Sequence, residues 1–335
     1  MERLWVLAAV AALLTGCGAI NDDDDCVRDN PLQECEDDGD TGTSTPDDDA
    51  TVASFSFAED MSTVTVRLVG LDTSPVDAVY TRNDRLTEVM GLDDYVAYSV
   101  QEDALDRFFL ALGGMSPDGS VSAVAVGDGG QFNNVFQDAD YARDGAFDPP
   151  DYETDPASGQ VTYVGNYAAV TNLGSRAGLD LKPVGDLPDD YSQLALPGQP
   201  AQITGVIFLN ANFADALVNG EILNRTLIDI RDADPTFPTG RTSLDKVVLT
   251  ESTIDELGEF TGGAEFEDES SVGTFAGIFG GEDATYAAGT TDLAWHLSAP
   301  FGEDGEYDIE EVGMFVLTQC GKAGAREDIC DLVNP

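Results

Sequence analysis

The sequence predicts a mainly β protein, with a C-terminal eight-stranded antiparallel up-and-down β-barrel preceded by a small mixed β/α domain. Eight segments between residues 157 and 320 alternate apolar and polar side chains as half-buried strands do, and no segment there has a long helical period. Eight strands in roughly 160 residues suit one closed antiparallel barrel. The segments are 160–169, 201–210, 216–224, 245–252, 258–267, 271–280, 285–296 and 309–318.

Side-chain size favours this barrel over a two-sheet sandwich, which would show a similar alternation. Large aromatic residues alternate with Gly or Ala on one face of several segments. A small barrel needs large and small side chains in alternation to fill its tapering interior, and glycine permits the coiling that closure requires. The alternating sets are Tyr163, Gly165 and Tyr167; Phe260, Gly262, Ala264 and Phe266; and Gly273, Phe275, Gly277 and Phe279.

Residues 51–150 are expected to form the small N-terminal mixed domain. Val52–Phe57 and Thr63–Val69 alternate like the two strands of a hairpin. Tyr95–Val100 and Ser120–Val126 have the same pattern. The apolar spacing within Asp103–Leu112 predicts a short helix. The residues that this helix would bury are Leu105, Phe108, Phe109 and Leu112.

Breaker residues mark the connections. Gly127-Asp128-Gly129-Gly130 predicts a tight turn, and it is not a phosphate loop because no Lys-Ser/Thr follows. Asp144–Pro156 is rich in Pro and Asp and predicts a linker to the barrel interval. Residues 321–335 would then form a C-terminal tail.

The first residues are typical of a bacterial lipoprotein signal. A charged start at Glu2 and Arg3 precedes an apolar run, and Leu14-Thr15-Gly16 places small residues before Cys17. We expect residues 1–16 to be a signal peptide and Cys17 to carry the lipid. The alternative is an ordinary signal peptide with an incidental cysteine.

The segment that follows, residues 17–50, predicts an acidic, disordered tether. It has few apolar side chains to bury, and its like charges extend it. Gly18 stands where an Asp would favour inner-membrane retention in many Gram-negative bacteria, so outer-membrane sorting is the expectation. No later segment has the apolar length of a transmembrane helix.

Four cysteines remain once Cys17 is assigned to lipid. An even number in an exported chain predicts two disulfides, and three pairings are open. The local pairing of Cys26 with Cys35 and of Cys320 with Cys330 is favoured because each closes a short loop. A metal site is the less favoured alternative, since the sequence has one histidine and no Cys-x-x-Cys.

The charge is strongly negative: 15 Lys and Arg stand against 64 Asp and Glu, a net charge of −49. Such a chain repels nucleic acid and anionic lipid, so a nucleic-acid partner is excluded. Because the acids are spread along the chain, solubility in salty water is favoured over a specific cationic or Ca²⁺ ligand.

Short motifs occur in a fixed order along the barrel interval. They are Val161–Tyr167, Leu209–Phe213 followed by Val218–Arg225, Phe260–Ala264, and Gly273–Gly280 with Ala284, Ala288 and Gly289. Together they resemble the eight-stranded barrel of the transferrin-binding protein B family of surface lipoproteins. The resemblance covers residues 157–320 and implies a barrel that serves as a platform, with function in its loops. Members of that family bind transferrin, complement regulators or haem-carrying proteins.

The sequence predicts no catalytic or metal site and no cofactor. Asp40-Thr41-Gly42 matches an aspartic-protease triplet but lies in the tether, without a second copy to share a proton. Asp138 and Asp140 begin an EF-hand pattern that Ala142 breaks. We interpret His296 as a surface residue near the end of a strand. The less favoured alternatives are a haem ligand and a pH-sensitive contact. Weak cation binding at Glu303–Asp308 remains an open alternative.

These observations lead to one functional expectation and two alternatives. We expect a lipid-anchored outer-membrane or cell-surface protein, not an enzyme, that captures a protein or a small nutrient ligand, with iron or haem as a candidate cargo. Its partners would be the membrane, through the lipid on Cys17, and an outer-membrane receptor or a host or environmental protein. The alternatives are a structural or adhesive envelope lipoprotein and, less favoured, a hydrolase acting through acidic residues of 51–150. Leu32, Phe136 and Phe147 lie in polar surroundings and could be exposed anchors for a partner, but core packing or chance is the favoured interpretation.

Overall fold

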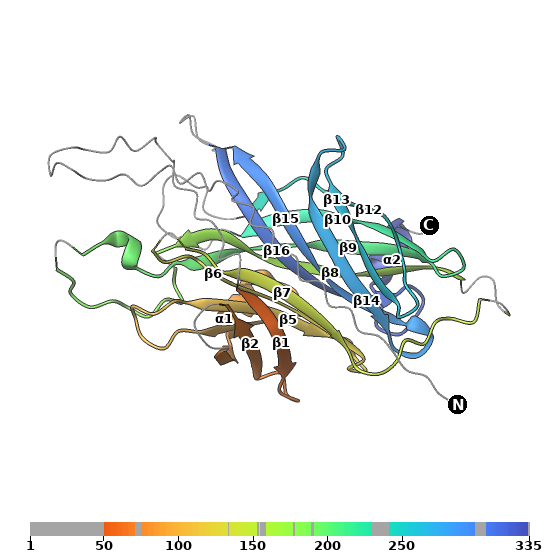
Figure 1. Ribbon diagram of the computed structural model, residues 1–335, viewed down its shortest axis with the longest axis horizontal. Coiled ribbons are helices and arrows are strands. Elements are labelled where there is room, and N and C mark those ends of the chain that lie inside the picture. Colours follow the sequence, from red (N-terminus) through yellow and green to blue (C-terminus); the bar gives the residue numbers. More distant parts are fainter. Residues whose placement is uncertain are drawn as a thin grey trace, which may run out of the picture. The chain divides into compact units, whose positions relative to one another are not determined.

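The computed structural model describes residues 50–333 apart from 71–75, 133, 153, 155–158, 177, 189–190, 229–240 and 299–305. The predicted signal peptide, the tether before Ala50, Asp40-Thr41-Gly42 and Leu32 lie outside these residues, as do Cys17, Cys26 and Cys35. The predicted mainly β fold is confirmed, and it consists of two antiparallel sheets (Figure 1).

The first sheet is a meander of seven strands in chain order, each antiparallel to the next. It is nearly closed, because the Val52 backbone N–H on the first strand donates to Asp138 Oδ2 on the last (2.6 Å). The strands are β1 (Thr51–Phe57), β2 (Thr63–Val69), β3 (Val76–Arg82), β4 (Val96–Val100), β5 (Phe109–Met115), β6 (Val121–Asp128) and β7 (Gln137–Arg143).

The second sheet closes into the predicted eight-stranded barrel. Its first strand pairs with both the second and the last, so the ring has no open edge there and the sandwich alternative is excluded. Each of the eight predicted segments overlaps one strand of the ring. These are β8 (Gln160–Ser175), β9 (Gln199–Asn212), β10 (Leu217–Ile228), β12 (Val247–Thr253), β13 (Glu259–Glu265), β14 (Ser271–Gly280), β15 (Tyr286–Ser298) and β16 (Glu306–Gln319).

Shorter elements accompany these strands. The three-residue β11 (Arg241–Ser243) pairs with β10 beside the ring. Two 3-10 turns, η2 (Gln193–Ala195) and η3 (Glu282–Ala284), lie in connections. The helix α2 (Glu327–Val333) packs on the barrel exterior, where Ile329 and Cys330 contact Val164.

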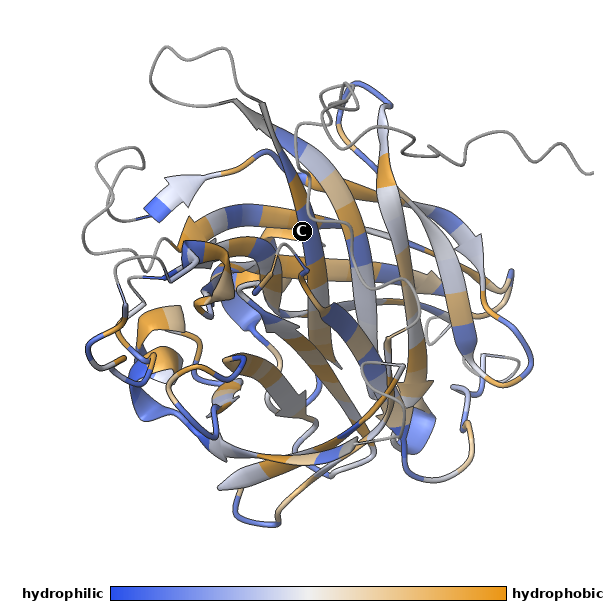
Figure 2. Cartoon of the chain, turned by 60° about the vertical axis from the view of Figure 1, so that its left-hand side comes forward, coloured by the Kyte–Doolittle hydropathy of each residue, from blue (hydrophilic) through white to orange (hydrophobic). Residues whose placement is uncertain are grey.

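The barrel interior is filled as the alternation predicts. Tyr163, Phe260 and Phe279 are at most 2% exposed. The centroid of the Phe279 ring lies 5.1 Å from that of Tyr163 and 5.0 Å from that of Phe260. Glycines make the room: a Cβ at Gly277 would lie 2.5 Å from the Phe260 ring, and one at Gly289 would lie 2.4 Å from the Phe315 ring. Figure 2 shows the resulting alternation of apolar and polar residues along the strands.

A second apolar core joins the first sheet to the outer wall of the barrel. Tyr95 anchors it: the Tyr95 hydroxyl donates to the Asn166 carbonyl on β8 (2.5 Å) and accepts from the Val316 N–H on β16 (2.8 Å). Burial raises the pKa of Tyr95 above its ordinary value of 10.0. The two sheets therefore share buried surface. The fully buried members include Leu86, Ala97, Leu110, Leu112, Ala123, Ala125, Ala168, Val170 and Met314.

The helix predicted over Asp103–Leu112 is wrong. Residues 109–115 form strand β5 between β4 and β6, and Leu105 is exposed. The apolar run Phe109–Leu112 is continuous because a central strand is buried on both faces, and the Gly113-Gly114 that follows disfavours a helix.

The helix of this domain lies instead at Asp84–Met90 (α1). Asn83 caps its start by accepting the Leu86 N–H (3.1 Å), and Gly91, with φ of 69°, ends it in the left-handed region.

The local pairing predicted for the C-terminal cysteines is present. Cys320 and Cys330 form a disulfide that connects the end of β16 to α2. The pairing of Cys26 with Cys35 stays a prediction, because both lie outside the described residues.

Candidate binding surface on three loops

Three connections meet at one end of the two sheets and form what we call the loop surface. They are the described residues of 101–108, 129–136 and 176–198, which follow β4, β6 and β8. Gln131 joins all three, because its Nε2 donates to the Leu105 carbonyl (2.8 Å) and to the Ala195 carbonyl (2.7 Å). The Phe132 N–H also donates to the Leu194 carbonyl (2.6 Å). Residues far apart in the sequence are thus held as one layer.

Glycine allows two of these loops to touch backbone to backbone. A Cβ on Gly129 would lie 2.4 Å from the Gly198 carbonyl carbon, and one on Gly174 would lie 1.7 Å from the Gly129 oxygen. The Gly198 N–H donates to the Gly130 carbonyl (3.0 Å) across this contact. The Gly-Asp-Gly-Gly segment therefore serves close packing of the first sheet on the barrel.

Asp128 fixes the turn that carries Gly129. Its Oδ1 accepts the N–H groups of Gly130 and Phe136, each at 3.0 Å, and its Oδ2 accepts from Arg107. Burial raises the pKa of the Asp128 carboxyl, although Arg107 and the two backbone donors oppose the shift. The hydrogen-bond partners of Asp128 lie in the connections of the first sheet, so the turn is held without a contribution from the barrel.

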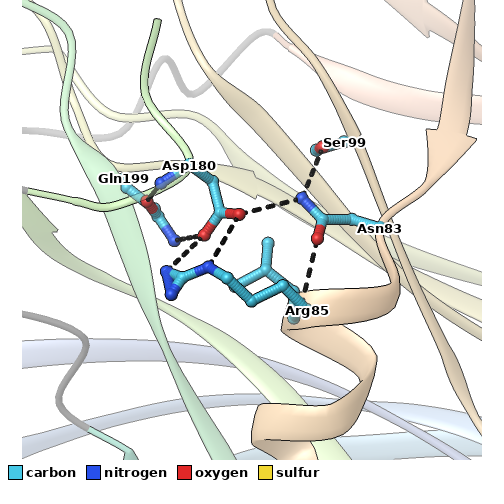
Figure 3. A network of polar contacts seen from close by, with 6 residues as sticks. Asn83, Arg85, Ser99, Asp180 and Gln199 are labelled. Carbon is cyan, nitrogen blue, oxygen red and sulfur yellow. Dashed lines mark hydrogen bonds and ion pairs between the residues drawn. The ribbon is translucent and has the colours of Figure 1, made fainter. Parts of the chain in front are cut away.

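Asp180 pins the long β8–β9 connection to α1 (Figure 3). Its carboxylate accepts two hydrogen bonds from Arg85, at 3.1 Å from Nε and 2.7 Å from Nη2. It also accepts from Asn83 Nδ2 (3.2 Å) and from Gln199 Nε2 (2.9 Å), and the Asp180 N–H donates back to Gln199 Oε1 (3.0 Å). The bidentate geometry fixes both position and orientation of the loop.

This pinned layer exposes apolar side chains. Phe132 is 65% exposed and has a φ of 57°, a left-handed conformation that costs a non-glycine residue free energy. Five of the ten large apolar side chains classed as exposed among the described residues belong to the loop surface. A well-ordered surface that keeps apolar groups in water is typical of an interaction site. The five are Leu105, Phe132, Leu179, Val184 and Leu194.

The candidate anchors named from the sequence are not the exposed side chains of this surface. Phe136 is 1% exposed in the core of the first sheet, so core packing, the favoured interpretation, is confirmed there and the anchor alternative is excluded. Phe147 is partly buried, with its ring 6.2 Å from that of Phe213. The exposed aromatic is Phe132, and its surroundings of turn-forming Gly, Gln and Asn residues were the available signal.

An acidic recess of about 350 Å³ lies between β7 and the barrel strands β14–β16. Its lining includes Asp138, Asp292 and Glu310, and Gln137 Nε2 donates to Glu310 Oε2 (3.3 Å). Burial raises the pKa of Asp138 and of Asp292, and the Asp292 charge adds to the shift at Asp138. Within the described ranges, no group of three or more His, Cys, Asp or Glu side chains could hold a metal ion.

The remaining candidates occupy ordinary structural positions. Asp138 and Asp140 lie on strand β7, not in a calcium loop. His296 is exposed near the end of β15, and its Nδ1 is 2.6 Å from Asp308 Oδ1 on the paired strand. Of the segment Glu303–Asp308, residues 303–305 fall outside the described residues, and the rest begins strand β16. No helix among those that the structure describes is long and apolar enough to cross a membrane.

The fold defines the class: a small seven-stranded sheet with one helix, packed on a filled eight-stranded barrel. The chain is similar to solved structures of transferrin-binding protein B, the family that its motifs resemble. The structure from Haemophilus parasuis shares 11% identity over 77% of this chain and 51% of that chain, with a TM-score of 0.35. The isotype 1 structure from serogroup B Neisseria meningitidis shares 10% identity over 78% and 50%, with a TM-score of 0.29.

The chain thus spans about half the length of these proteins. No protein-family model matches its sequence. No curated protein matches it either.

Proposed function

We propose that this protein is a lipid-anchored outer-membrane binding protein that captures a protein ligand through the loop surface. The observation that carries the proposal is the combination of rigidity and exposure. Hydrogen bonds of Gln131 and the ion pair of Asp180 tie the loops to one another and to α1, and Phe132 and Leu194 nevertheless stand in water at 65% and 44% exposure. Preorganised apolar groups lose little conformational entropy on binding, which favours affinity.

The filled barrel supports a protein ligand over a small molecule held inside. Aromatic rings occupy the interior, and the Arg225 side chain, 1% exposed, takes up the space beside Trp295. A surface of loops on a packed scaffold suits recognition of another macromolecule.

The anchoring part of the proposal rests on Leu14-Thr15-Gly16-Cys17 and on the acidic segment that follows. A lipid on Cys17 would tether the chain, and the segment up to residue 50 would hold the loop surface away from the membrane. The second candidate is a structural or adhesive envelope lipoprotein. Its deletion would change envelope integrity or attachment without loss of any captured ligand.

The test uses the full chain on intact cells. Metabolic labelling with an alkyne fatty acid should mark the wild-type protein and not Cys17→Ala, and external protease should cleave the wild type on intact cells. Cells are then incubated with biotinylated transferrin, the first ligand to test because of the motif resemblance, and with the proteins of the native environment. Captured protein is quantified after photo-crosslinking.

We expect Phe132→Ser and Leu194→Asp to abolish capture. Val79→Asp is the matched control, since Val79 is a similarly exposed apolar residue (54%) on β3, outside the loop surface. Equal capture by Phe132→Ser and wild type, or no captured protein at all, would overturn the proposal.

A further inference from the structure

The loop surface contains a recess with an unusual charge. The recess has a volume of about 280 Å³, and the walls come from the β8–β9 connection and from Ala104. Its lining has two cations and no carboxylate, in a chain of net charge −49. The three other recesses described each include at least one Asp or Glu. The lining residues are Ala104, Arg176, Gly178, Leu181, Lys182, Pro183, Val184, Leu196 and Pro197.

Arg176 is the distinctive residue of this recess. It is exposed, and among the Lys and Arg side chains of the described ranges it alone has no hydrogen bond, ion pair or ring contact. Arg143, Arg241 and Lys182 donate to backbone carbonyls. The others pair with carboxylates: Arg67, Arg82, Arg85, Arg107, Arg225, Lys246, Lys322 and Arg326. Because Arg176 has no partner among the described residues, its guanidinium is available to an external carboxylate.

The second cation is held in place but keeps its charge available. Lys182 Nζ donates to the Glu102 backbone carbonyl (2.6 Å), and the Lys182 N–H donates to Gln101 Oε1 (2.8 Å). Gln101 is 9% exposed and in turn donates to the Asp106 carbonyl (3.0 Å). These bonds fix the Lys182 backbone at the edge of the recess, so the second positive charge is already positioned.

The rest of the recess is apolar and preformed. Leu181 packs against the apolar core that the two sheets share, and Asp180 beside it is pinned by Arg85. Pro183 and Pro197 restrict the backbone of the two walls. The recess volume of about 280 Å³ lies just below the range of about 300–1,000 Å³ that is usual for small-molecule pockets, so the recess suits one large side chain better than a whole small-molecule ligand.

We infer that this recess recognises an apolar side chain that stands next to a carboxylate on the protein ligand, with Arg176 binding the carboxylate and Lys182 assisting it. The inference rests on the proposed function and names the chemistry of the ligand segment. Charge complementarity selects an acidic segment, and the apolar walls select its neighbouring side chain.

A matched pair of dipeptides tests this directly on the full-length protein. The probes are N-acetyl-leucyl-glutamate amide, with one side-chain carboxylate, and the neutral N-acetyl-leucyl-glutamine amide. Binding is followed by NMR through the methyl signals of Leu181 and Leu196. We expect the acidic probe to bind about tenfold more tightly than the neutral probe, because the neutral probe cannot form the charge-assisted hydrogen bond. Binding of the acidic probe should weaken as the salt concentration is raised.

The variant Arg176→Gln should lower affinity for the acidic probe about tenfold and leave the neutral probe unaffected. Arg67→Gln is the matched control, because Arg67 is an exposed arginine on β2, outside the recess. Both side chains are exposed, so both variants should keep the wild-type unfolding temperature. Equal binding of the two probes, or no effect of Arg176→Gln, would overturn the inference.

The cell assay separates this inference from the proposed function. If wild-type cells capture a protein ligand and Arg176→Gln cells capture it equally, the recess assignment is wrong and the proposed function stands. If wild-type cells capture nothing, the proposed function is wrong whatever the dipeptides do.

Discussion

Arg225 on β10 and Glu311 on β16 form an ion pair inside the barrel, with side chains 1% and 0% exposed. Glu311 also accepts from the Trp295 indole N–H (2.8 Å) and bonds to the Tyr167 hydroxyl (2.8 Å), and the Arg225 guanidinium lies over the Trp295 ring. Removing both charges from water is costly, and only these added contacts offset the cost. The pair therefore connects β10 to β16 across the barrel interior.

Removing the charge of Glu311 should destabilise the fold severely. Glu311→Gln leaves the Arg225 charge buried without its counter-ion, and we expect the free energy of unfolding to fall by about 3–5 kcal/mol. Urea unfolding followed by the fluorescence of buried Trp295 measures this. The double variant Arg225→Met/Glu311→Leu removes both charges and should be markedly more stable than Glu311→Gln. A single variant within about 1 kcal/mol of wild type would contradict the interpretation.

Adding a methyl group at the glycine contact should separate the loops from the barrel. Because a Cβ on Gly129 would lie 2.4 Å from the Gly198 backbone, Gly129→Ala should cost about 1–3 kcal/mol of unfolding free energy. Gly185→Ala, in the same loop surface, meets nothing within 4 Å and should leave stability nearly unchanged. Urea unfolding midpoints of the two variants are compared. A lower midpoint for Gly129→Ala alone would show that the close backbone contact, and not the loss of a glycine as such, lowers the stability.

Loosening the Asp180 network should release the β8–β9 connection without unfolding the barrel. Asp180→Asn removes the charge that holds Arg85, so we expect amide hydrogen exchange in residues 178–199 to become roughly tenfold faster. Asp84→Asn is the control, since Asp84 pairs with Arg82 on the surface and such pairs contribute little. Exchange that stays unchanged in Asp180→Asn would show that other contacts hold the loop.

The acidic recess should make the protein more stable on mild acidification. Burial raises the folded-state pKa of Asp138 and Asp292 above the ordinary 3.8, so the folded chain binds these protons more tightly than the unfolded chain. The stability that protonation provides is complete below the unfolded pKa and is lost as pH rises through the folded pKa.

Asp292→Asn should accordingly raise the unfolding temperature at pH 7, and the difference from wild type should vanish toward pH 4. Glu88→Gln, which removes an exposed carboxylate on α1, controls for the net charge. A gain for Asp292→Asn that is equal at both pH values would contradict the assignment.

The disulfide should stabilise the C-terminal helix. The sequence separation of Cys320 and Cys330 is 10. From the entropy of closing such a loop, we expect the free energy of unfolding to fall by about 3 kcal/mol in the double variant Cys320→Ser/Cys330→Ser. Hydrogen exchange in α2 should rise first, because Ile329 packs beside the bond on Val164. Unchanged protection of α2 would mean that packing alone holds it.

The barrel was predictable because its information is local. The alternation of large aromatic residues with Gly or Ala appears within single segments, as it does for Gly273, Phe275, Gly277 and Phe279. The wrong helix at Asp103–Leu112 has the opposite cause: the apolar run there reflects burial of β5 on both faces, in two different cores, and no window of the sequence reveals those packing partners. The exposed anchor was missed for the same reason, since Phe132 and Phe136 differ only in which side chain the turn directs inward.

By itself, the sequence predicted the fold class, the eight strands of the barrel and a lipid at Cys17, and it favoured the pairing of Cys320 with Cys330 among three open pairings. Each depends on residue types within a short stretch. Only the tertiary structure decided that Asp180 meets Arg85, that Gly129 meets Gly198, and that Arg176 has no partner among the residues that the structure describes. These contacts join residues of separate strands and loops. They form only when the two sheets pack together, and that packing depends on the whole chain.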